Sequence, residues 1–234
     1  MFISSNLKIK RARIHINELE RTLSSVTGPG SIATLAPVLR HNWRGEIMPI
    51  GSFKTPAMPE MVPAILGDIV HNLRSSLDLM ASQMAAQNNR STSGVYFPFA
   101  ENSVSLNEMI KRKNFDRCGK AVVDLLRTFQ PYKNGNVQLR AIHDMDIIDK
   151  HKGLIPNPSL TVEATVILEE RPVVSDFQVT GFTFADDTGL GGAEIVKTCK
   201  NLVSLCESIL ESFACLEFAN DPRRNPSGDI TADS

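Results

Sequence analysis

The most constraining feature of this sequence is the apolar pattern between residues 60 and 88. Large apolar side chains recur there every three or four positions, which places them on one side of an α-helix. Pro63 falls in the expected first turn, where a missing backbone N–H costs little. The stripe consists of Leu66, Ile69, Val70, Leu73, Leu77, Met80 and Met84. It predicts a long helix with one side in a hydrophobic core.

The remaining sequence predicts a mostly helical α+β fold. Further helical patterns cover about residues 5–26, 105–113, 118–129, 137–151 and 193–218. Residues 159–185 are instead β-branched and roughly alternating, with Arg171-Pro172 in the middle, which is typical of an antiparallel strand pair. Residues 38–50 offer one or two extra short strands. We expect a bundle of about five or six helices with a small antiparallel β-sheet or hairpin.

The length of 234 residues suits one large domain, or one domain with an appended lobe. We predict a single helical-bundle domain over residues 1–220, with the β insert at about 159–185. Residues 221–234 are rich in polar residues and proline, and they predict a flexible tail.

Composition excludes several classes of protein. Lys and Arg number 25 against 26 Asp and Glu, and this balance argues against a protein that binds mainly by neutralising phosphates. No apolar run approaches the ~20 residues that span a bilayer, and the N-terminus lacks the apolar core of a signal peptide. The four cysteines form no C-x-x-C pair: Cys118, Cys199, Cys206 and Cys215. We predict buried, reduced thiols in a cytoplasmic protein without a membrane segment.

The side of the 60–88 helix opposite the apolar stripe carries the first candidate site. His71, Arg74, Ser75 and Asp78 are one turn apart and therefore share a face. Arg74 can bond Asp78, and its planar fork also suits a phosphate or carboxylate ligand. His71 suits acid or base work near neutral pH. The alternative interpretation is a solvated helix face with an ordinary ion pair.

A second polar group lies on the 137–151 helix. Four of its residues share one side: Arg140, His143, Asp144 and His151. Asp149 lies on the opposite, apolar side and needs a partner if it is buried, for which Arg74 and Lys150 are candidates. Otherwise Asp149 caps a neighbouring helix or faces solvent, and His151 only complements the helix dipole.

Other chemistry is less well supported. A metal would require His71, Asp78, Asp149 and His151 to converge, and the chain has neither H-E-x-x-H nor paired Glu-x-x-His. It also lacks G-x-S-x-G, a P-loop and a dinucleotide fingerprint. We predict no metal and no cofactor. The candidate polar site comprises His71, Arg74, Asp78, Asp149, Lys150 and His151.

Four segments together resemble the signature of a widespread bacterial family of uncharacterised cytoplasmic proteins. They are residues 65–78 with HNLRSSLD at the end, 96–99 (YFPF), 130–132 (QPY) and 146–152 (DIIDKHK). The resemblance extends over about residues 56–154. It implies a shared fold and polar site more than a particular reaction.

A fainter similarity connects that family to HEPN-type helical ribonucleases of toxins and anti-phage systems. The family's helix often has an arginine followed after four residues by a histidine. In the ribonucleases, a histidine and an arginine, usually from two protomers, flank the scissile phosphate without a metal. In this chain Leu79 stands where the histidine would follow Arg74. His71 or His151 would have to replace it.

Two functions from different classes follow. The first, which we favour, is a non-catalytic binding or assembly module in which Arg74, Asp78 and Asp149 form a buried polar network. The alternative is a HEPN-like metal-independent ribonuclease, or another phosphodiester-acting enzyme, in a defence or toxin–antitoxin system. The expected partners are RNA or another phosphate-bearing ligand, a second copy of the chain, or a partner protein, and no membrane.

Overall fold

The computed structural model describes residues 2–27, 34–41, 44–45, 47–54, 57–167 and 173–219. The helices are α1 (Ile3–Ser24), α2 (Val62–Gln87), α3 (Ser103–Arg112), η1 (Phe115–Cys118), α4 (Lys120–Thr128), α5 (Val137–His151), η2 (Asp186–Thr188) and α6 (Ile195–Ala219). The strands are β1 (Thr34–His41), β2 (Ile47–Lys54), β3 (Ser159–Ile167) and β4 (Val173–Thr183). The prediction of a mostly helical bundle is confirmed. The predicted tail, residues 221–234, lies outside the described residues.

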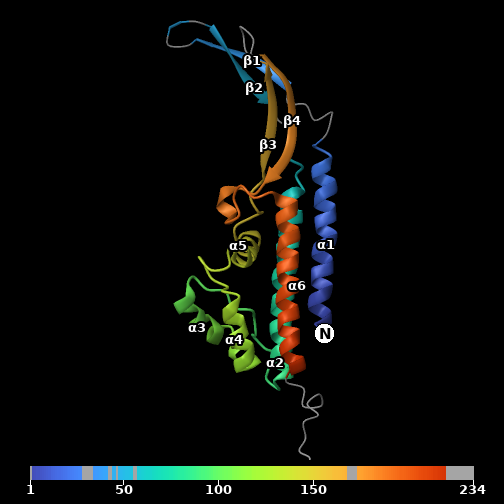
Figure 1. The fold of residues 1–234 in the computed structure, drawn as a ribbon, viewed down its shortest axis with the longest axis vertical. Coiled ribbons are helices and arrows are strands. Elements are labelled where there is room, and N and C mark those ends of the chain that lie inside the picture. The colour runs from blue at the N-terminus through green and yellow to red at the C-terminus, as the bar shows by residue number, and fades with distance from the viewer. Residues whose placement is uncertain are drawn as a thin grey trace, which may run out of the picture.

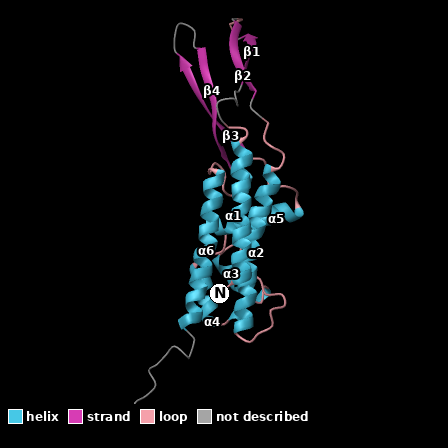
Figure 2. Cartoon of the chain, turned by 90° about the vertical axis from the view of Figure 1, so that its right-hand side faces the viewer, coloured by secondary structure: helices cyan, strands magenta, loops and turns pink. Residues whose placement is uncertain are grey.

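Three long helices form the body of the molecule. Helices α1, α2 and α6 lie side by side, with α1 antiparallel to the other two (Figure 1). Helix α5 packs against α2 and α6, and η1, α3 and α4 gather near the other end of α2 (Figures 1 and 2). Because α2 contacts α1, α5, α6 and η1, it is the central helix of the bundle.

The strands form two antiparallel pairs beyond one end of the bundle (Figure 2). β1 pairs with β2 from Thr34↔Lys54 to His41↔Ile47. β3 pairs with β4 from Ser159↔Thr183 to Ile167↔Val173, with two irregularities in register. The first pair connects α1 to α2, and the second connects α5 to α6. Helices α2 and α5 contact each other directly.

Local signals begin and end the helices around the candidate site. Asn136 accepts the Leu139 N–H through its side chain and caps the start of α5. Asn102 and Ser105 form a reciprocal capping box at the start of α3. Gly119 adopts a φ of 97° between η1 and α4, a conformation that side-chain-bearing residues disfavour. These caps fix the positions of α5 and of the loop that precedes α3.

The predicted apolar stripe of α2 is buried along its whole length. On the opposite side of α2, Gly67 and Arg74 are buried, whereas His71, Ser75 and Asp78 are half-buried. The interpretation of that side as a solvated face is therefore wrong at Arg74, because α5 and the loop after α2 pack over it. The described helices include none with the length and apolar character that a membrane-spanning segment needs.

The cysteines are free thiols. Cys118, Cys199 and Cys206 are buried, and burial raises the pKa of each thiol to about 12. Cys215 is exposed near the end of α6, so the prediction of buried thiols is wrong for this residue. The three buried thiols stay protonated at neutral pH and do not act as nucleophiles.

Candidate functional site

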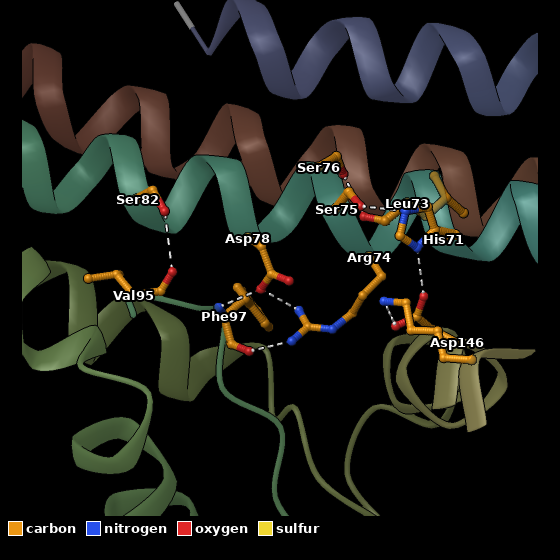
Figure 3. A network of polar contacts seen from close by, with 11 residues as sticks. His71, Leu73, Arg74, Ser75, Ser76, Asp78, Ser82, Val95, Phe97 and Asp146 are labelled. Atoms are coloured by element: carbon orange, nitrogen blue, oxygen red, sulfur yellow. Dashed lines mark hydrogen bonds and ion pairs between the residues drawn. The ribbon is translucent and has the colours of Figure 1, made fainter. Parts of the chain in front are cut away.

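Arg74 ties α2 to the loop that follows it (Figure 3). Its Nη1 donates to Asp78 Oδ1 at 2.7 Å, and its Nη2 donates to the Phe97 carbonyl at 3.1 Å. The Phe97 N–H donates to the same Asp78 oxygen at 2.8 Å, which closes a ring of hydrogen bonds. Burial raises the pKa of Asp78, while Arg74 and the Phe97 N–H oppose this shift. Only 8% of the Arg74 side chain is exposed.

Arg140 on α5 also bonds an aspartate four residues further along its helix and a backbone carbonyl of the same loop. Its Nε donates to both Asp144 oxygens at 2.9 Å, again one turn further along the helix. Its Nη1 donates to the Ala100 carbonyl, and its Nη2 donates to Glu101 Oε1 at 2.9 Å. Residues 95–101, which we call the clamped segment, are thus bound by one buried arginine from α2 and one from α5.

Phe99 of the clamped segment lies between the two helices. The Arg74 guanidinium carbon lies 4.5 Å from the centre of its ring, and the His143 ring stacks on it with a centroid distance of 4.7 Å. Among the residues that the structure describes, His143 Nδ1 is buried without a hydrogen-bond partner. Burial, helped by the positive charges of Arg74 and Arg140, lowers the pKa of His143 to about 4. His143 is therefore neutral at pH 7.

A second polar group lies one turn away on α2 and centres on His71 (Figure 3). His71 Nδ1 lies 3.1 Å from Asp146 Oδ1, and Lys150 Nζ donates to Asp146 Oδ2 at 2.7 Å. On the other edge of the ring, Nε2 lies 3.4 Å from Ser75 Oγ. Asp146 is only 6% exposed, whereas 41% of the His71 side chain is exposed. We call His71, Ser75, Asp146 and Lys150 the histidine group.

Asp149 does not join this group. It faces Gly67 so closely that a Cβ added to the glycine would lie 2.2 Å from Asp149 Oδ1. Within the described part of the chain it forms no hydrogen bond or ion pair. The prediction that Arg74 or Lys150 pairs with Asp149 is wrong, because these cations bond Asp78 and Asp146. Burial raises the pKa of Asp149, and the nearby carboxylates of Asp146 and Asp68 add to the shift.

The other candidate residues do not come together in one site either. His151 is exposed at the end of α5 and lies outside both groups. Arg74 reaches toward Phe97 while His71 reaches toward Asp146, so the two side chains point to different partners although they are one turn apart. Leu79, at the position of the expected ribonuclease histidine, is partly exposed.

The sequence interpretation missed Asp146, the buried carboxylate of the histidine group. A signal was present, because Asp146 lies between Leu139 and Ile142 in direction when α5 is viewed along its axis. A carboxylate on that apolar side predicts a buried, partnered group. Asp149 also lies on this apolar side, nearer the helix end, and the sequence prediction names it instead.

A cavity of about 280 Å³ adjoins the Arg140 side of the site. Lys133, Val137, Arg140, Asp144 and Gly189 are among its lining residues. Lys133 and Arg140 are both bonded to Glu101, which limits their capacity to hold an added anion. Among the described residues, no group of three or more His, Cys, Asp or Glu side chains is arranged to hold a metal ion.

Comparisons with protein-family models, with curated protein sequences and with solved structures found no match. The resemblances to a bacterial family and to HEPN-type ribonucleases therefore stay predictions. The function has to be argued from the geometry of the two polar groups.

Proposed function

We propose that the protein is a non-catalytic binding or assembly module. The buried side chains of Arg74 and Arg140 stabilise its fold, and the partly exposed histidine group contacts a partner. The observation that supports this most directly is the engagement of Arg74. Its guanidinium is buried and bonded to Asp78 and to a backbone carbonyl. To contact a phosphate in solvent, Arg74 would have to leave Asp78 and the Phe97 carbonyl with unsatisfied hydrogen-bonding groups.

The charges of the exposed face favour a protein partner over RNA. His71 and Lys150 share one carboxylate, that of Asp146, and Asp68 and Asp149 add two more nearby. This face therefore carries more negative than positive charge when His71 is neutral, which opposes a polyanion. A second copy of the chain or another protein with basic or polar side chains is the partner that this face suits. The cytoplasmic and phage-defence settings stay predictions.

An RNA-cleavage assay tests the non-catalytic part of this proposal. Purified parent protein should leave total RNA intact, as should a variant carrying Arg74→Ala and His71→Ala. Degradation by the parent that the double variant has lost would contradict the proposal. Equal degradation by both proteins would indicate a contaminating nuclease, and the assay would then be repeated after further purification.

Solution mass tests the assembly part. If a second copy is the partner, light scattering should give a dimer, and Lys150→Glu should weaken it by adding negative charge to the shared face. Lys120→Glu, at an exposed position on α4, is the matched control. A parent monomer at high concentration would exclude self-assembly and leave a different protein as the partner.

Metal-independent phosphodiester cleavage is the second candidate function. The observation that favours it is the orientation of His71 by Asp146, which an acid–base histidine requires. Such a mechanism would need a cation for the phosphate, and Lys150 rather than Arg74 lies beside the histidine. In the RNA assay, loss of cleavage in His71→Ala but not in Arg74→Lys would support this candidate.

A further inference from the structure

Three residues of the histidine group are arranged as a nucleophile, a base and an orienting carboxylate. Ser75 Oγ faces His71 Nε2 at 3.4 Å, and His71 Nδ1 faces Asp146 Oδ1 at 3.1 Å. These are the same ring nitrogens that serve the serine and the aspartate in catalytic triads. We propose that Ser75, His71 and Asp146 form a surface site that hydrolyses small carboxylic esters through an acyl-serine intermediate.

The partners of His71 select one tautomer of its neutral ring. Asp146 is held by the Lys150 ammonium, and an ionised carboxylate only accepts hydrogen bonds. Nδ1 of the imidazole must then carry the proton that it donates to Asp146. In the neutral imidazole the Nε2 lone pair then faces the Ser75 hydroxyl, which is the tautomer that a general base for serine needs.

Ser75 also differs from its neighbour on α2. The Ser76 hydroxyl is fully buried and donates to the Leu73 carbonyl at 2.7 Å (Figure 3). Ser204 and Ser212 on α6 likewise donate to the carbonyl four residues earlier. The Ser75 hydroxyl is instead in contact with a histidine nitrogen. Its proton is therefore available to a base rather than held by the helix backbone.

The reaction that this arrangement supports is balanced without a cofactor. Ser75 Oγ bonds to the ester carbonyl carbon while its proton moves to His71 Nε2. The carbon–oxygen bond to the alcohol then breaks, and the alcohol leaves with that proton. Water repeats the sequence on the acyl-serine. Its oxygen bonds to the carbon while one of its protons moves to His71 Nε2; the bond between the carbon and Ser75 Oγ then breaks, Oγ takes that proton, and a carboxylic acid is released. Asp146 is a positioning residue that holds the imidazole and stabilises its charged form.

Exposure and charge limit the substrate class. The His71 side chain is 41% exposed and Ser75 is half-buried, so the reacting atoms lie at the surface. This position suits small acyl groups on good leaving groups, which depend least on further stabilisation of the oxyanion. Asp68 and Asp149 place negative charge near His71, which disfavours anionic esters. A neutral or positively charged ester is expected. This activity goes beyond the proposed binding function and does not depend on it; ester hydrolysis at this site would replace the non-catalytic part of that proposal and leave its binding part in place.

Covalent labelling tests the proposal. The folded parent protein is treated with a fluorophosphonate probe, in which serine displaces fluoride from phosphorus, and the adduct is located by tandem mass spectrometry. We expect an adduct on Ser75 that Ser75→Ala abolishes and the matched control Ser76→Ala retains. His71→Gln should lower the labelling rate about 100-fold. The rate of 4-nitrophenyl acetate hydrolysis should be highest for the parent and Ser76→Ala, lower for His71→Gln and lowest for Ser75→Ala.

The positioning role of Asp146 has its own readout. Asp146→Asn should lower the labelling rate of Ser75, and Asp146→Glu should restore part of it by returning a carboxylate. Circular dichroism shows whether each variant is folded, and the comparison between Ser75→Ala and Ser76→Ala stands even if the Asp146 variants unfold. An absence of adduct on Ser75 in the parent, or an equal labelling rate in His71→Gln, would overturn the proposal.

Discussion

Two polar parts of the molecule lie one helical turn apart on α2 and use similar residue types. The arginine part is Arg74 with Asp78 and the clamped segment, and the histidine part is the histidine group around His71. Around Arg74, hydrogen bonds of 2.7 to 3.1 Å join the side chains of Arg74 and Asp78 to each other and to the backbone of Phe97 in the clamped segment. Around His71, the two histidine contacts are 3.1 and 3.4 Å, the second longer than any bond of Arg74, and the ring is partly exposed. The difference comes from the clamped segment, which covers Arg74. A polar helix face becomes structural where a loop covers it and stays accessible where the cover is partial.

Removing the guanidinium of Arg74 should have the largest effect on stability. Arg74→Ala leaves the partly buried Asp78 and the Phe97 carbonyl without their cation, and we expect a loss of about 3 kcal/mol in the free energy of unfolding. Urea denaturation followed by circular dichroism measures it. The matched control is Arg127→Ala, which removes an exposed pair with Asp124 and should cost less than about 1 kcal/mol. Equal midpoints for the two variants would show that the arginine part is not structural.

Acid should destabilise the arginine part through His143. Its pKa is about 4 in the folded protein against 6.5 for the unperturbed group, so the unfolded chain binds the proton more readily between these values. Stability should therefore fall as the pH drops from about 6.5 toward 4, by roughly 2–3 kcal/mol.

The control for this pH effect is His143→Phe, which keeps the ring on Phe99 but cannot titrate. Because all other groups are the same, the difference between the two pH profiles isolates His143. Parallel profiles for the parent and the variant between pH 4 and 6.5 would contradict the predicted neutral histidine.

Gly67→Ala probes how closely α2 and α5 approach beside the histidine group. The added Cβ would meet Asp149 Oδ1 at 2.2 Å, so Asp149 has to move, at a cost of about 1–2 kcal/mol. Adding Asp149→Ala should recover most of this loss. A double-mutant cycle on unfolding free energies measures the coupling, and strictly additive effects would show that the helices are not in contact there.

Removing the imidazole of His71 should have the smallest effect on folding. His71→Ala leaves Asp146 bonded to Lys150, and the lost pair is partly exposed, so we expect less than about 1 kcal/mol. Thermal melting measured beside Arg74→Ala gives the contrast directly. A loss as large as that of Arg74→Ala would place both groups in one structural network.

Periodicity predicted the local features well. The predicted helix at 137–151 has the bounds of α5, and that at 60–88 differs from α2 by only a residue or two. The Arg74–Asp78 bond also follows from spacing alone, since residues four apart on a helix meet. The same rule explains why Lys150 bonds Asp146 rather than the adjacent Asp149, whose side chain points about 100° away.

Partners from distant segments were not predictable. The Phe97 backbone and Asp146 lie 19 and 75 residues from the side chains they bond, Asp78 and His71. Helical spacing gives the direction of a side chain around its own axis but does not say which segment packs there. The sequence therefore places Arg74 in the candidate polar site and gives no sign that a loop and a second helix bury it.

Hydrogen exchange at the Phe97 amide tests the division between the two parts most directly, because this N–H donates to Asp78 in the ring that Arg74 closes. The amide should be protected in the parent protein and in His71→Ala, and it should exchange much faster in Arg74→Ala under conditions where that variant remains folded. Unchanged protection in Arg74→Ala, or loss of protection in His71→Ala alone, would contradict the account.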